Sequence, residues 1–152
     1  ISDLQGKSQD LTLAGSPECR QRIDCLAGLE KYYDLQFAKF IPIDIGLRYE
    51  VLDKGDADLS ILFTSDAQLF VDSDKYTLLE DDKGVLPAGN VIFISDAKVA
   101  NEAGPDYQAT IEEVQQGLTL EVMQELNARV DIDKEKPEDV ATQYLQEAGY
   151  IE

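Results

Sequence analysis

Over the first two thirds of the chain, short apolar runs alternate with segments in which apolar residues recur every three or four positions. Short apolar runs bounded by turn residues predict strands, and such runs occupy residues 10–15, 37–45, 57–63, 77–80 and 91–95. Apolar positions three or four residues apart predict helices among these strands, at residues 23–33, 46–54 and 67–71. Strands that alternate with helices are typical of an α/β fold with a mostly parallel sheet.

Residues 96–152 follow with helical patterns alone. Pro105, Thr119 and Pro137 each favour the start of a helix, because proline suits the first helical turn and threonine caps it. Gly149 suits the end of the last of these helices. We therefore expect an α/β sheet region followed by a helical C-terminal segment.

The charge balance narrows the classes of function. The 152 residues include 13 Lys and Arg and 31 Asp and Glu, which gives a net charge of −18. Such a surface repels phosphate backbones and anionic lipid headgroups, so we expect neither a nucleic-acid partner nor an anionic membrane surface. The sequence has no His, the commonest general base and metal ligand, and no dinucleotide-binding or P-loop motif. These observations argue against an enzyme, and we expect no cofactor and no metal site.

Cys19 and Cys25 lie in one short segment. Zinc requires more ligands than this pair offers, and redox pairs are more often spaced C-x-x-C. An even number of cysteines at short spacing in a very acidic chain favours a local disulfide and an oxidising, extracytoplasmic setting. The alternative is a pair of reduced thiols in a loop at the start of a helix.

Ligands of parallel α/β sheets bind at the carboxyl ends of the strands, where three loops qualify, at residues 16–24, 46–49 and 64–68. Arginine is scarce in the chain, and Arg20, Arg22 and Arg48 fall in or beside these loops. A guanidinium there is suited to a bidentate contact with a ligand carboxylate. The alternative for each arginine is a surface ion pair. The third loop begins with Thr64-Ser65-Asp66, a polar cluster suited to capping the following helix.

Glu80-Asp81-Asp82 is the most conspicuous acidic cluster. We interpret it as a solvated turn, because adjacent carboxylates are expected by chance in so acidic a chain. A calcium site and a catalytic carboxylate pair are the alternatives, although the cluster lacks the regular ligand spacing of an EF-hand.

Several stretches of the chain together resemble one known family. In order, they are Leu11-Thr12-Leu13-Ala14-Gly15-Ser16-Pro17-Glu18, Gly28-Leu29-Glu30-Lys31-Tyr32-Tyr33, Gly55-Asp56-Ala57-Asp58, Phe63-Thr64-Ser65-Asp66, Leu79-Glu80-Asp81-Asp82-Lys83 and Glu125-Leu126-Asn127. Their order and spacing resemble the substrate-binding protein of osmoprotectant ABC transporters, which take up glycine betaine, choline and related quaternary ammonium compounds. The resemblance extends from about Ile1 to Ile151.

The resemblance implies a type II periplasmic-binding-protein-like fold, in which two α/β lobes close on the ligand. Family members are much longer than this chain, and the sequence resembles their second half. Residues 1–80 would then form the second, inserted lobe, residues 81–95 a crossover segment, and residues 96–152 the C-terminal helices that complete the first lobe. The implied partners are the missing N-terminal lobe and an ABC transporter permease. The implied location is extracytoplasmic, with a membrane anchor in the full-length protein.

The resemblance also implies site residues. A quaternary ammonium group donates no hydrogen bond, so aromatic faces bind it by cation–π attraction, and a betaine carboxylate needs an Arg or Lys. The family's carboxylate-binding Arg matches Arg22, and one aromatic residue of its cage matches Phe63. Thr64 and Asp66 are further cleft-facing candidates, and Arg48 joins them from its loop position.

Some relatives carry two cysteines flanking the carboxylate-binding Arg, so the resemblance implies a disulfide between Cys19 and Cys25 that pins the loop of Arg22. Another cage Tyr of the family falls within residues 86–90, where this sequence has no aromatic residue. The alternative function is therefore a binding-protein-like interaction domain that no longer binds an osmolyte.

The C-terminal helices raise a question of packing, because the resemblance implies that they normally cover a sheet absent from this chain. Their apolar stripes comprise Ile111, Val114, Val122, Leu126, Val140 and Leu145. We expect either a rearranged helical tail or a homodimer to cover these stripes.

Overall fold

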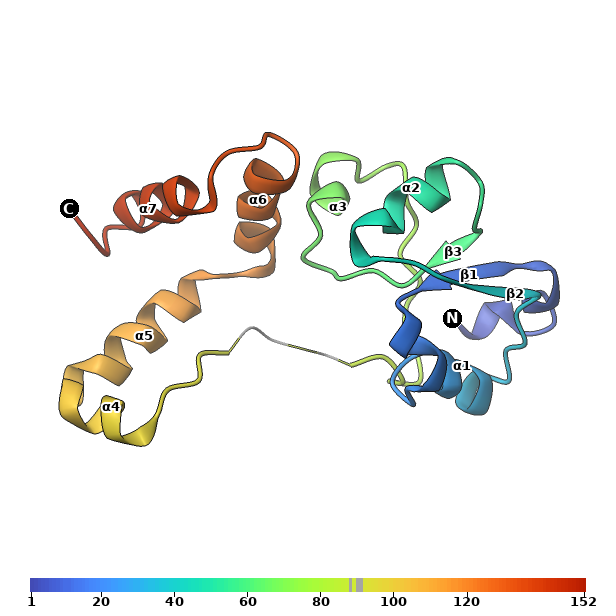
Figure 1. The fold of residues 1–152 in the computed structure, drawn as a ribbon, viewed down its shortest axis with the longest axis horizontal. Coiled ribbons are helices and arrows are strands. Elements are labelled where there is room, and N and C mark those ends of the chain that lie inside the picture. Colours follow the sequence, from blue (N-terminus) through green and yellow to red (C-terminus); the bar gives the residue numbers. More distant parts are fainter. Residues whose placement is uncertain (88, 90–91) are drawn as a thin grey trace. The chain divides into compact units, whose positions relative to one another are not determined.

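The computed structural model describes residues 1–87, 89 and 92–152, which form two compact units. The first unit contains Ile1–Phe63 and Thr77–Gly89, and the second contains Thr64–Tyr76 and Asn90–Glu152. The strands belong to the first unit and the longest helices to the second (Figure 1).

The first unit is built on a parallel sheet with the strand order β2-β1-β3. β1 is Thr12–Gly15, β2 is Lys39–Pro42 and β3 is Leu59–Ser60. The first three predicted strands are thereby confirmed, with shorter bounds. β3 pairs with β1 through two residues, and the Ile61 amide extends the contact with a 3.0 Å hydrogen bond to the Ala14 carbonyl.

Helices connect these strands. α1 is Leu26–Tyr33 and α2 is Arg48–Asp53, both within the predicted helical ranges. Short 3-10 helices occupy Ser2–Leu4, Ser8–Asp10, Pro17–Gln21 and Ile45–Leu47. Gly55 follows α2 with a φ of 71°, the left-handed conformation in which glycine commonly ends a helix.

The main hydrophobic core of the first unit joins β1 to α1. Its buried members are Leu13, Cys19, Cys25, Leu26, Leu29, Tyr33 and Leu35. Gly28 marks a close approach, since a Cβ there would lie 1.8 Å from the Ile23 carbonyl oxygen and 2.6 Å from Cγ1 of Val85. This packing holds the loop after β1 firmly against the sheet.

The strands predicted at residues 77–80 and 91–95 are wrong for the described residues, and residue 91 lies outside that part of the chain. Residues 77–80 and 92–95 adopt no regular secondary structure, and they carry exposed side chains, 58% for Leu78 and 89% for Ile94. An alternating apolar pattern is only part of what a strand requires, because its backbone groups also need a partner strand. In the described residues, the sheet consists of β1, β2 and β3, and residues 77–80 and 92–95 have no partner strand.

The second unit is helical. Its helices are α3 at Ala67–Val71, α4 at Ala97–Ala103, α5 at Pro105–Gly117, α6 at Leu120–Asp131 and α7 at Pro137–Glu147. The helices predicted at residues 67–71 and from Pro105, Thr119 and Pro137 are confirmed. α4 has no counterpart among the predicted helices, and it begins where the Asp96 carboxylate accepts a 2.8 Å hydrogen bond from the Lys98 amide.

α6 is the centre of packing in the second unit, because it contacts both α3 and α7. Thr119 caps α6 by accepting a 3.3 Å hydrogen bond from the Val122 amide, as predicted. Val140 of α7 is buried, and the other members of the predicted apolar stripes are half-buried. The unit thus covers part of these stripes with its own helices. None of the helices in the described residues is both long and apolar enough to cross a lipid bilayer.

Candidate functional site

The carboxyl edge of the parallel sheet organises the candidate residues of the first unit. β1 leads into the loop that carries Arg20 and Arg22, β2 into the turn before Arg48, and β3 into the segment that ends at Phe63. Because the strands are parallel, all three connections leave the sheet at the same edge. This is the edge at which ligands of such sheets bind.

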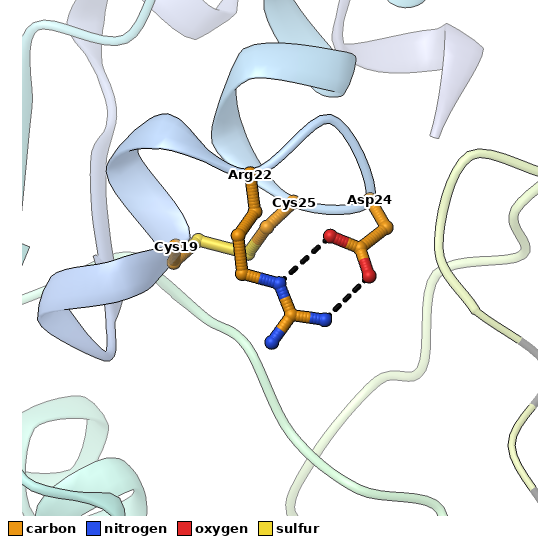
Figure 2. The surroundings of a disulfide bond; sticks show 4 residues. All are labelled: Cys19, Arg22, Asp24 and Cys25. Atoms are coloured by element: carbon orange, nitrogen blue, oxygen red, sulfur yellow. Dashed lines mark hydrogen bonds and ion pairs between the residues drawn. A yellow bond between two sulfur atoms is a disulfide. The ribbon is translucent and has the colours of Figure 1, made fainter.

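A disulfide between Cys19 and Cys25 closes the loop after β1 (Figure 2). Both cysteines are buried in the core, 2% and 6% exposed, so the bond fixes the two ends of the loop. The predicted disulfide is present, and the alternative of two reduced thiols does not apply to this structure. Arg22 lies inside the loop and its side chain is 56% exposed.

Arg22 extends a planar guanidinium fork that Asp24 occupies (Figure 2). Nε donates a 2.8 Å hydrogen bond to Oδ1 of Asp24, and Nη2 donates to Oδ2. The hydrogen bond to Asp24 raises the pKa of Arg22, and the same contact lowers the pKa of the Asp24 carboxyl group. The surface ion pair considered for Arg22 is thus present. Exposed ion pairs contribute little to stability, and the two contacts have the bidentate geometry in which a guanidinium binds carboxylates in general.

Arg48 and Phe63 form a second contact. The Arg48 guanidinium carbon lies 4.8 Å from the centroid of the Phe63 ring, within the range of a cation–π interaction. Phe63 is nevertheless 55% exposed. Arg20 makes the same type of contact with Phe40 of β2, at 5.0 Å. Each of these arginines therefore lies over an aromatic ring.

Thr64 and Asp66 belong to the second unit, where α6 holds the backbone between them. The carbonyl of Thr64 accepts a 2.6 Å hydrogen bond from Gln124, and the carbonyl of Ser65 accepts a 2.8 Å hydrogen bond from Asn127. Asp66 occupies the N-cap position of α3 and is 8% exposed. Its side chain accepts no hydrogen bond from the first turn of α3, so the prediction of a side-chain cap is wrong. The polar amides of α6 anchor this segment instead.

The acidic cluster lies at a turn of residues 82–83 in which Glu80 and Asp82 are exposed, as the interpretation of a solvated turn expects, and two of its carboxylates also accept hydrogen bonds. The Tyr33 phenol and the Leu86 amide both donate to the Asp81 carboxylate, the amide at 2.6 Å. The Ser2 amide and hydroxyl donate to the Asp82 carboxylate at 3.1 and 2.5 Å, and these bonds lower the pKa of Asp82. Burial and the hydrogen bond to Asp81 raise the pKa of Tyr33 to about 12. Among the described residues, no group of three or more His, Cys, Asp and Glu side chains is placed to hold a metal ion.

A family model matches residues 1–147 of the chain, that of OpuAC, the substrate-binding domain of the ABC-type glycine betaine transport system. The match covers almost the whole sequence. The chain therefore belongs to this family, and its fold is of the periplasmic-binding-protein type, with a parallel sheet and flanking helices.

Individual relatives support the same assignment. The carnitine transport binding protein OpuCC of Listeria monocytogenes is 27% identical over 100% of this chain and 49% of its own length. The ergothioneine transport permease/ergothioneine binding protein EgtU of Helicobacter pylori is 31% identical over 98% of this chain and 26% of its own length. A crystal structure of a glycine betaine/carnitine/choline ABC transporter superposes with a TM-score of 0.76, at 25% identity over 99% of this chain and 54% of that one. The chain thus spans about half the length, or less, of these relatives.

Proposed function

We propose that this chain is the ligand-binding part of an ABC importer for quaternary ammonium osmolytes, and that it provides one side of the ligand site. The observation that carries this proposal is the placement of Arg22, Arg48 and Phe63 after three parallel strands that end at one edge of the sheet. The family match over residues 1–147 supports it. The role is binding rather than catalysis and requires no cofactor, in keeping with a sequence that contains no His.

The proposed roles follow from the chemistry of each side chain. Phe63, which is 55% exposed, offers its aromatic ring to the quaternary ammonium group. Arg22 holds the carboxylate of a betaine or of carnitine after exchange with Asp24, because its fork matches two carboxylate oxygens. The proposal extends to Arg48, and to Thr64 and Asp66, which follow Phe63 in the sequence.

The proposed partners are an N-terminal lobe of the same protein and the permease of the transporter. This chain spans only about half the length of two relatives, which supports an N-terminal lobe as its partner. In this proposal residues 1–80 are the inserted lobe, residues 81–95 a crossover and residues 96–152 the helices that complete the first lobe. A homodimer is the alternative cover for the apolar stripes of those helices. The disulfide between Cys19 and Cys25 supports an extracytoplasmic location, and we place a membrane anchor in the full-length protein.

The test is a calorimetric titration of glycine betaine, choline, carnitine and proline into two proteins. One is this chain and the other is the same sequence extended by the preceding part of its gene. We expect one of the quaternary ammonium ligands to bind to the extended protein and Arg22→Ala to weaken that binding. Lys54→Gln is the control, because it removes one positive charge that pairs with Glu50 on α2. If no ligand produces heat with either protein, the osmolyte assignment is wrong and the interaction-domain alternative stands.

A further inference from the structure

The exposed aromatic ring of the proposed site already has a cation over it. Arg48 lies at the start of α2, after β2, and its guanidinium carbon is 4.8 Å from the centroid of Phe63, after β3. Both residues belong to the first unit. The side chain of Arg48 is half-buried, whereas 55% of the surface of Phe63 is exposed.

A comparison within the same unit separates this contact from ordinary packing. The guanidinium of Arg20 lies 5.0 Å from the centroid of Phe40, but Phe40 is a half-buried residue of β2 that packs against the hydrophobic core. Arg20 therefore covers a ring that is already part of the structural framework. Arg48 instead covers a ring that remains open to solvent, where a ligand can approach.

A guanidinium and a quaternary ammonium group are attracted to an aromatic face by the same electrostatic interaction. They compete when they use the same face. Resting on the proposed function, we propose that Arg48 is a specificity-determining residue: it acts as an internal competitor for Phe63 and disfavours ligands that carry a positive charge and no carboxylate.

The chemical reason is that some ligands offer the displaced guanidinium a new hydrogen-bond acceptor and others do not. A ligand that is only a cation, such as choline or tetramethylammonium, removes Arg48 from the ring and adds a second positive charge near it. A betaine also displaces Arg48, but its carboxylate has about four lone-pair sites, so it can accept from the displaced guanidinium of Arg48 in addition to the fork of Arg22. The free energy lost at the ring is thus recovered for the zwitterion and not for the simple cation.

The test measures the affinity of tetramethylammonium, choline and glycine betaine for whichever form of the protein binds glycine betaine in the calorimetric titration. The variants are Arg48→Gln and, as a control matched in charge, Lys54→Gln. We expect Arg48→Gln to tighten tetramethylammonium and choline by about two- to fivefold, the contribution of one exposed cation–π contact. We expect no gain for glycine betaine. Lys54→Gln should shift all three ligands in the same direction by less.

Two further readouts separate the possible failures. In the wild type, the Arg48 side-chain protons should show upfield ring-current shifts that disappear in Phe63→Leu, and unchanged amide spectra for the rest of the first unit show that the variants are folded. If the wild type binds glycine betaine but Arg48→Gln leaves the choline-to-betaine ratio of affinities unchanged, the inference is wrong and the proposed function stands. If no form binds any of the three ligands, both are wrong.

Discussion

The phenol of Tyr33 donates a hydrogen bond to the carboxylate of Asp81, which lies 48 positions further along the chain. Tyr33 is the last residue of α1 and is completely buried. Its oxygen also accepts a 2.7 Å hydrogen bond from the Lys83 amide. These two bonds attach residues 81–83 to the core of the first unit, and the described residues 77–87 take part in no strand pairing.

Replacement of Tyr33 by Phe should destabilise the first unit. The variant removes one donor and leaves the part-buried Asp81 oxygen and Lys83 amide without that partner, and the loss of a hydrogen-bond partner is costly where water has limited access. We expect the midpoint of thermal unfolding to fall by about 2–8 °C. Tyr32→Phe is the matched control, because that side chain is 48% exposed. Equal effects of the two substitutions in a calorimetric scan would contradict the structural role of the buried pair.

The same phenol predicts a dependence of stability on alkaline pH. The folded-state pKa of Tyr33 is raised from 10.0 to about 12 by burial and by the hydrogen bond to Asp81. A group whose pKa is raised on folding stabilises the native state fully below its unfolded pKa, and that contribution is lost as the pH rises toward the folded value. Denaturant titrations between these two pH values should therefore show a loss of stability in the wild type that is smaller in Tyr33→Phe. Parallel curves for the two proteins would exclude Tyr33 as the titrating group.

The local elements were predictable because their signals are local. Thr119 and Pro137 determine where two helices begin, and the structure places both helices there. The pairing of Tyr33 with Asp81 was not predictable, since nothing near either residue identifies its partner. For the same reason the hydrogen bonds of the acidic cluster were not predictable, since their donors come from Ser2 and Tyr33, far away in the sequence.

The candidate site was predictable in part. The short spacing of Cys19 and Cys25 indicated the disulfide that the structure contains, whereas the ligand contacts of Arg22 and Phe63, which the resemblance implies, stay predictions. The ion pair between Arg22 and Asp24 has a sequence signal, namely opposite charges two positions apart inside a closed loop. The contact between Arg48 and Phe63 depends on the positions of two loops and has no such signal.

Loss of the disulfide should destabilise the first unit and loosen the loop that carries Arg22. The bond joins residues separated by 6 positions, and closure of so short a loop stabilises by about 2 kcal/mol. Reduction should therefore lower the free energy of unfolding in denaturant by about that amount. The double variant Cys19→Ser with Cys25→Ser should match the reduced protein and should not respond to reductant. A variant that still responds to reductant would show that the reagent acts elsewhere.

Gly28 should tolerate no side chain. In the interior of a helix, alanine is normally favoured over glycine by about 1 kcal/mol. Here an added Cβ would lie 1.8 Å from the Ile23 carbonyl oxygen, a backbone atom that cannot move aside cheaply. We expect Gly28→Ala to lower the free energy of unfolding by about 1–3 kcal/mol or more, because the clash outweighs the propensity. Gly46→Ala, where nothing lies within 4 Å of the added Cβ, should be close to neutral. A stabilised Gly28→Ala protein would refute the close packing of α1.

Arg129 should control the packing of α7 on α6 through the shape of its guanidinium as well as its charge. Nε and Nη2 donate hydrogen bonds of 2.9 and 2.7 Å to the Glu135 carboxylate, and Nη2 also donates a 2.7 Å bond to Gln143 of α7. Lysine keeps the charge but lacks the planar fork, so Arg129→Lys cannot make all three bonds at once. We expect amide hydrogen exchange in α7, including that of the buried Val140, to become faster in Arg129→Lys, while amides of β1 in the first unit keep their rates.

Lys98→Arg is the control. Lys98 forms an exposed ion pair with Glu102 on α4, and this pair involves neither α6 nor α7. Unchanged exchange in α7 would mean that apolar contacts alone hold it on α6, and that the guanidinium fork is dispensable.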